Sequence, residues 1–156
     1  MKNLALVAVL VFWTTPFVST GFAEDEQVDE QKQELVEKLV EKLNGCKFVG
    51  RYTMGDKDDA SLTDEYTVSS FEPTANEDEY KMVVRIKYGK KDVEAPLIMR
   101  VLFAGTTPVI TLESVWVPGL GTFDSHVVIR GNAYAGTWDH DGVGGHVFGK
   151  IEKTSP

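Results

Sequence analysis

The chain has 156 residues, of which 16 are Lys or Arg and 24 are Asp or Glu, and its formal net charge is −8. A chain of this length can bury one hydrophobic core, so we expect one domain. The acidic balance argues against nucleic acid and anionic membranes as partners, because affinity for phosphates comes from clustered Lys and Arg. Cys46 is the single cysteine, which excludes an internal disulfide and predicts a buried structural thiol.

Residues 1–23 predict a secretory signal peptide. A basic start at Lys2, an apolar run over residues 4–13 and small residues at Gly21 and Ala23 are typical of such a segment. The apolar run is too short for a membrane span, which needs about 20 apolar residues. We therefore expect cleavage near Ala23, export to the periplasm or the cell exterior, and no membrane span in the mature chain.

Residues 24–45 predict an amphipathic helix. Its apolar side chains recur at spacings of three and four and fall on one stripe: Leu35, Val36, Leu39, Val40 and Leu43. Asn44-Gly45 supplies the stop, since glycine suits the left-handed position that follows a helix. We expect this stripe to pack against the domain that follows; a homodimer through the helix is the alternative.

After Cys46 the apolar period changes to two, which is typical of strands. Strands are expected over residues 46–54, 64–71, 80–88, 96–103, 109–117 and 123–130, with an acidic turn over 55–61. Residues 96–103 are apolar on both faces except Arg100, so the outer face needs a cover, and the helix stripe is available for it. In the strand over 109–117, alternation places Ile110, Leu112 and Trp116 on one face.

The last stretch, residues 131–151, predicts a closing hairpin around Asp141-Gly142, a pair that suits a tight turn with two positive φ angles. Its other glycines indicate a strongly curved sheet or a close approach of another backbone. Every connection between the eight strands can be a hairpin. We therefore predict an all-β domain over residues 46–153, an eight-stranded antiparallel up-and-down barrel preceded by one amphipathic α-helix.

Two short motifs resemble the Gly-x-Trp type strands of lipocalin-like (calycin) barrels. They are Phe48-Val49-Gly50-Arg51-Tyr52 on the first strand and Gly136-Thr137-Trp138 near the end. The sequence departs from true lipocalins because Tyr52 stands where the first-strand Trp would be, the helix precedes the barrel and no disulfide is present. The resemblance implies a barrel that holds a small apolar molecule; some relatives hold haem or act as cyclases or isomerases.

The strand pattern also predicts which side chains point inward. This set is mostly apolar with a few polar tips, which suits a hydrophobic ligand: Phe48, Tyr52, Tyr66, Tyr80, Met82, Ile86, Tyr88, Met99, Phe103, Leu112, Trp116, Phe123, Tyr134 and Trp138. We take as candidate ligand-binding residues Tyr52, Tyr80, Met82, Tyr88, Phe103, Trp116, Tyr134 and Trp138. An eight-stranded barrel either holds one small ligand or is filled by its own side chains, and the pattern alone leaves both open.

The histidines of the last hairpin suggest a metal site, which we do not adopt. His140 and His146 flank the turn, with Asp139 and Asp141 nearby, and two imidazoles with a carboxylate would suit a zinc-like ion. The number of possible ligands is small and a turn holds ligands less rigidly than a strand or helix, so we expect no metal and no cofactor.

No catalytic residue can be assigned from the sequence. Asp124, Ser125 and His126 are adjacent, but neighbours on a strand point to opposite faces and cannot form a triad. We expect an exported, non-catalytic protein that holds a small apolar ligand inside its barrel. The alternatives are an interaction module with a filled barrel that uses its helix as the contact surface, and a barrel enzyme of cyclase or isomerase type.

Overall fold

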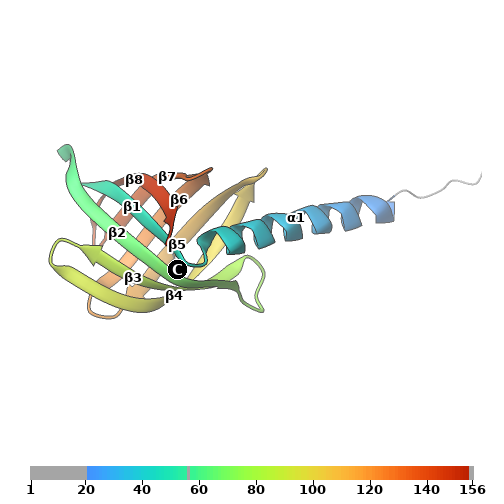
Figure 1. The fold of residues 1–156 in the computed structure, drawn as a ribbon, viewed down its shortest axis with the longest axis horizontal. Helices are drawn as coiled ribbons and strands as arrows, with labels where there is room; N and C mark the ends of the chain where they lie inside the picture. The colour runs from blue at the N-terminus through green and yellow to red at the C-terminus, as the bar shows by residue number, and fades with distance from the viewer. Residues whose placement is uncertain (1–20, 56, 155–156) are drawn as a thin grey trace, which may run out of the picture.

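The computed structural model describes residues 21–55 and 57–154. These residues form one α-helix followed by eight strands, and each strand pairs antiparallel with the next until β8 closes the barrel against β1 (Figure 1). The predicted eight-stranded up-and-down barrel is confirmed. The elements are α1 (Gly21–Leu43), β1 (Cys46–Met54), β2 (Lys57–Pro73), β3 (Glu79–Tyr88), β4 (Lys91–Ala104), β5 (Thr107–Val117), β6 (Gly121–Arg130), β7 (Ala133–His140) and β8 (Val143–Lys153).

The predicted signal peptide falls mostly on residues 1–20, which lie outside the described residues. Residues 21–23, at its predicted end, open α1. No helix in the described part of the chain is long and apolar enough to cross a membrane.

Helix α1 closes one end of the barrel and then projects away from it (Figure 1). Leu39 and Leu43 of the predicted stripe are buried, and Val36 and Val40 pack against the same core. The helix stops where expected, since Gly45 has a φ of 61° and β1 begins one residue later. We call this end of the barrel the helix end; it also holds the turns that follow β2, β4 and β6.

Polar contacts fix the helix to the helix end. The amide of Asn44 forms two hydrogen bonds with the backbone of Phe71 in β2, at 2.7 and 2.9 Å. Lys32 forms an ion pair with Glu77 in the β2–β3 turn, with Nζ and Oε1 3.0 Å apart. Lys42 Nζ donates to Asn132 Oδ1 in the β6–β7 turn at 2.7 Å. The helix therefore joins three separate parts of the barrel rim.

The predicted cover of β4 by the helix is wrong. Ile98 and Leu102 point outward and remain 46% and 42% exposed. The reason lies in the two-residue connection Asn44-Gly45, which is too short for the chain to turn back along the barrel wall. The helix stripe is used at the helix end instead.

Several of the most deeply buried side chains of the described residues pack at the helix end. Leu43, Cys46, Phe71 and Val101 have essentially no exposed surface. Tyr80 stacks on Phe71, with ring centroids 5.0 Å apart and planes at 5°. Burial of each large apolar side chain stabilises the fold by about 1.5–3 kcal/mol. The helix end of the barrel is therefore a packed core.

Of two turns predicted from the sequence, one is confirmed and the other is wrong. The Asp141-Gly142 hairpin is confirmed, since φ is 54° and 82° at its two central residues and His140 pairs with Val143. The acidic turn expected over residues 55–61 is wrong, because β2 already begins at Lys57. The strand β2 therefore begins seven residues earlier than alternation indicated, whereas β1 has its predicted bounds.

Candidate functional site

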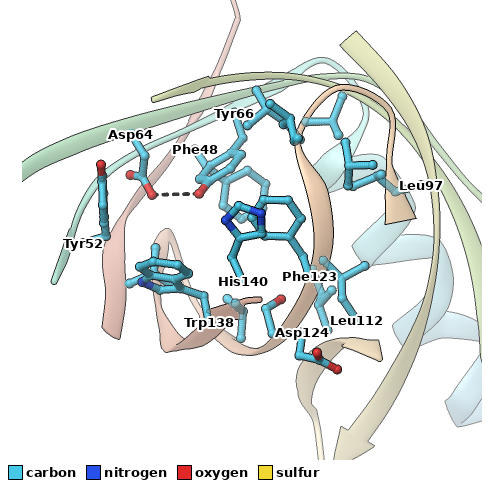
Figure 2. Close-up of a pocket in the computed structure, with 18 of the residues that line it drawn as sticks. Phe48, Tyr52, Asp64, Tyr66, Leu97, Leu112, Phe123, Asp124, Trp138 and His140 are labelled. Atoms are coloured by element: carbon cyan, nitrogen blue, oxygen red, sulfur yellow. Dashed lines mark hydrogen bonds between the residues drawn. The ribbon is translucent and has the colours of Figure 1, made fainter. Parts of the chain in front are cut away.

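A cavity of about 510 Å³ lies inside the barrel. One side of its wall is aliphatic and comes from β3, β4 and β5: Met82, Val84, Ile86, Leu97, Met99 and Ile110. The other side is aromatic and comes from β1, β2, β6 and β7: Phe48, Tyr52, Tyr66, Phe123, Tyr134 and Trp138 (Figure 2). Ligand pockets in proteins usually enclose about 300–1,000 Å³, so a small molecule has room here.

The cavity reaches the barrel end opposite the helix, which we call the mouth. Leu120 from the β5–β6 turn and Asp141 from the β7–β8 turn line it, together with Met54 at the end of β1. Beside them, the imidazole of His140 stacks on Phe123, with ring centroids 4.3 Å apart and planes at 6°. His140 Nε2 lies 3.2 Å from Asp141 Oδ2, close enough for an ion pair when the imidazole is protonated. The mouth is therefore more polar than the wall.

One row of cross-strand neighbours carries the polar part of the wall. Tyr134 on β7 pairs with Gly149 on β8, Gly149 pairs with Gly50 on β1, and Gly50 pairs with Asp64 on β2. A β-carbon at Gly50 would collide with the Tyr134 hydroxyl, and one at Gly149 would lie 2.9 Å from the Tyr134 ring. The two glycines thus leave space for the Tyr134 ring to lie along the inner wall toward Asp64.

Asp64 is the buried acid of the cavity, with 4% of its surface exposed. The Tyr66 hydroxyl donates a hydrogen bond to its Oδ2 at 2.9 Å (Figure 2). Its other oxygen, Oδ1, and the Tyr134 hydroxyl are both buried without a hydrogen-bond partner in the described part of the chain. The two groups nevertheless act on each other, since the Tyr134 hydroxyl lowers the pKa of the Asp64 carboxyl, and Oδ1 still has the capacity to accept a hydrogen bond from a ligand.

Burial governs the protonation of this cluster. Desolvation raises the pKa of the Asp64 carboxyl, and the hydrogen bond from Tyr66 opposes this increase only in part. Desolvation and the charge of Asp64 also raise the pKa of Tyr66 and of Tyr134. Both phenols therefore stay protonated at neutral pH, and both remain hydrogen-bond donors.

The aromatic side of the wall is held by edge-to-face ring pairs. Phe48 meets Tyr134 with centroids 5.1 Å apart and planes at 70°. Tyr52 meets Trp138 with centroids 5.8 Å apart and planes at 81°. Trp138 Nε1 donates to the Thr53 carbonyl at 3.1 Å. Such pairs fix the orientation of the rings, each contributing about 0.5–1.5 kcal/mol beyond burial.

The structure brings four of the candidate ligand-binding residues to the cavity wall: Tyr52, Met82, Tyr134 and Trp138. Tyr80 belongs to the packed core at the helix end. Phe103 lies near the end of β4 on the same side and does not line the cavity. The side chain of Tyr88 lies outside the described part of the chain.

Trp116 is on the outer surface, 66% exposed, so its predicted inward position is wrong. A β-bulge in β5 causes the difference: Leu112 pairs with Ser125, but Val115 pairs with Phe123, which leaves one extra residue in β5. Ser114 in this bulge has a φ of 53°, and its N–H donates to Asp124 Oδ1 at 2.8 Å. Beyond the bulge, the inward positions of β5 are shifted by one residue.

The two histidines considered for a metal lie on opposite faces of the barrel wall. His140 lines the cavity, whereas His146 is exposed on the outside and contacts Thr53. Within the described residues, no three His, Cys, Asp or Glu side chains gather closely enough to hold a metal ion.

Asp64 and His140 are two titratable cavity residues that the sequence-based candidate set omits. Alternation predicts that Tyr66 points inward, and Asp64 lies two residues before it on the same face. The inward position of Asp64 could therefore be inferred from the sequence. The acidic composition of this segment hid the inward position of Asp64, because residues 56–65 contain five acids and such a segment is typical of a solvated loop. His140 was considered only as a residue of the turn.

No known protein family and no curated protein matches this sequence. Among solved structures, the chain is similar to secretory abundant heat soluble protein 4 from Ramazzottius varieornatus, with 11% sequence identity and a TM-score of 0.35. The match covers 73% of this chain and 96% of that chain.

Proposed function

We propose that this protein binds a small apolar molecule inside its barrel and performs no chemistry on it. The observation that carries this proposal is the cavity of about 510 Å³, whose wall is largely apolar and which reaches the mouth. Eight strands make a barrel that is just wide enough for one small ligand. The helix closes the opposite end, which leaves the mouth as the route of entry. A filled barrel, the structural alternative, has no space of this size.

The proposal includes export of the chain after removal of residues 1–23. The apolar run near the N-terminus supports it. N-terminal sequencing of the mature protein from its own source tests this part; a chain that keeps Met1 would contradict it. The likeness to lipocalin-like barrels belongs to the proposal as well, and a hollow barrel with one closed end supports it.

The binding test uses two neighbouring residues of β6 that point to opposite faces. Val127 lines the cavity, whereas Val128 is 43% exposed on the outside. Val127→Trp should fill part of the cavity and weaken binding of an uncharged fluorescent probe, N-phenyl-1-naphthylamine, about tenfold or more. Val128→Trp should bind the probe like the wild type. Equal binding by both variants would show that the probe does not enter the barrel.

A barrel enzyme of cyclase or isomerase type is the second candidate, favoured by the buried Asp64 carboxyl beside two phenols. Such a group, with a raised pKa in an apolar site, suits proton transfer. Incubation with lipophilic extract from the source organism separates the two. Conversion of many equivalents of one component, lost in Asp64→Asn, would establish catalysis, whereas one retained and unchanged equivalent supports binding.

A further inference from the structure

The cavity wall carries acids but no fixed cation. Its charged or titratable groups other than tyrosines are Asp64, Asp124, His140 and Asp141, and no lysine or arginine of the described residues lines it. Asp64 is the deepest of these groups and is 4% exposed. A ligand with a carboxylate or phosphate group would meet a buried acid there without a compensating charge, which costs free energy.

The surroundings of Asp64 favour a cationic group instead. Its Oδ1 faces the Tyr134 hydroxyl but forms no full hydrogen bond within the described residues, and Tyr52, Tyr66 and Trp138 contribute rings to the same part of the wall (Figure 2). The faces of aromatic rings attract ammonium groups, and several such rings together recognise amines in other proteins. A carboxylate surrounded by aromatic rings supplies both the charge and the desolvated walls that an ammonium group needs.

We propose that the cavity binds a lipophilic amine, with the ammonium group donating to Asp64 Oδ1 and the hydrocarbon part lying against the aliphatic side of the wall. This inference rests on the proposed binding function and adds the chemical class of the ligand. The Tyr134 hydroxyl, placed toward Asp64 by Gly50 and Gly149, can accept a second N–H. The raised pKa of Asp64 supports the assignment, because burial disfavours its charged form and a nearby cation would stabilise that form.

The test compares three ligands with the same hydrocarbon chain: decylamine, decanol and decanoate. Each displaces N-phenyl-1-naphthylamine from the full-length protein at neutral pH. Decylamine should displace the probe at a concentration about tenfold below that of decanoate, with decanol between them. The ammonium group of decylamine donates a charge-assisted hydrogen bond to Asp64, whereas the carboxylate of decanoate is repelled by it. Equal or better displacement by decanoate would overturn the proposal.

A pair of variants locates the effect at Asp64. Asp64→Asn should weaken displacement by decylamine about tenfold and change that by decanol less than about twofold. The matched control is Glu65→Gln, the next residue of β2, which points outward and forms ion pairs with Lys47 and Lys87. An Asp64→Asn variant that binds decylamine like the wild type would overturn the proposal. If Asp64→Asn does not fold, Tyr134→Phe should still reduce the preference for the amine over the alcohol.

The outcomes separate the ligand class from the binding function itself. If the probe and decanol bind but the amine has no advantage, the amine assignment fails and the binding function stands. If neither the probe nor any of the three ligands binds, the binding function fails as well.

Discussion

Tyr134 and Asp64 stand at the two ends of one row of cross-strand neighbours, and both positions between them are glycines, Gly149 and Gly50. The row spans four strands, β7, β8, β1 and β2. Side chains on one face of a barrel normally fill such a row. Here the two positions without a side chain let the Tyr134 side chain cover them, so that residues 70 positions apart in sequence come together along the inner wall.

Gly50→Ala should destabilise the fold, because its β-carbon would collide with both the Tyr134 hydroxyl and the Phe148 carbonyl. Overpacking of this kind costs about 1–3 kcal/mol in the free energy of unfolding. Urea denaturation measures the loss. Val49→Ala, at the neighbouring outward position that is 39% exposed, should stay within about 0.5 kcal/mol of the wild type. Equal stability of Gly50→Ala and wild type would show that both Tyr134 and the Phe148 backbone can shift without cost.

The Asp64 carboxyl should make stability depend on pH. Its folded-state pKa is raised by burial, so between the ordinary value and the raised value the folded state keeps a proton that the unfolded state has released. The free energy of unfolding therefore falls as pH rises through this window. Tyr66 and Tyr134, which face Asp64, remain neutral throughout, because their own pKa values are raised.

Asp64→Asn removes this dependence, since an amide does not ionise. The difference in free energy of unfolding between the variant and the wild type should move in favour of the variant from about pH 4 to about pH 7. Denaturation at several pH values measures it, with Glu65→Gln as the control. A difference that stays constant with pH would mean that Asp64 is no harder to ionise when folded.

The fold was predictable from sequence because the local signals agree with one another. Period-two alternation, turn residues such as Asp141-Gly142 and the stop at Asn44-Gly45 all specify the same hairpins. Alternation predicts the wrong face for Trp116, because one extra residue in a β-bulge moves every later side chain of the strand to the opposite face of the sheet. A bulge stabilised by a bond from Ser114 to Asp124, on another strand, has no local signature in β5.

The candidate site was only half predictable, for a different reason. Apolar alternation identifies wall residues such as Met82 and Trp138, since it marks the inner face. It does not show whether they leave a space between them. The contact between Tyr134 and the Asp64 region depends on the register of three strand pairs, and register across a barrel is a property of the closed sheet.

Ligand binding should be visible in the fluorescence of Trp138 and not in that of Trp116. Trp138 lines the cavity and donates to Thr53, whereas Trp116 is on the outside. Trp116→Phe should keep the change in emission on addition of decanol, and Trp138→Phe should lose it. Trp13 is common to both variants and cannot account for a difference between them. A response that follows Trp116 would place the ligand outside the barrel.

The Cys46 thiol should resist modification in the folded protein. It has no exposed surface, and burial raises its pKa to about 11, so only about one thiol in a thousand is ionised near pH 8. Iodoacetamide should label it only after addition of denaturant. Thr63→Cys adds an exposed thiol on β2 and should take up one label per folded chain. Rapid labelling of the native wild-type protein would show that the helix end opens readily.

Leu43→Ala should destabilise the protein more than a change at any other position of the helix stripe. Leu43 is fully buried among the core residues of the helix end, and truncation of a buried leucine costs about 2–5 kcal/mol. Leu35 lies eight residues earlier in the helix and is half-buried. Leu35→Ala should therefore lower the free energy of unfolding by less than about 1 kcal/mol. Denaturation of both variants measures the difference. Because Leu43 does not line the cavity, probe binding by folded Leu43→Ala should match the wild type. Equal losses of stability for the two variants would mean that the helix is held by its whole length and not by its last turns.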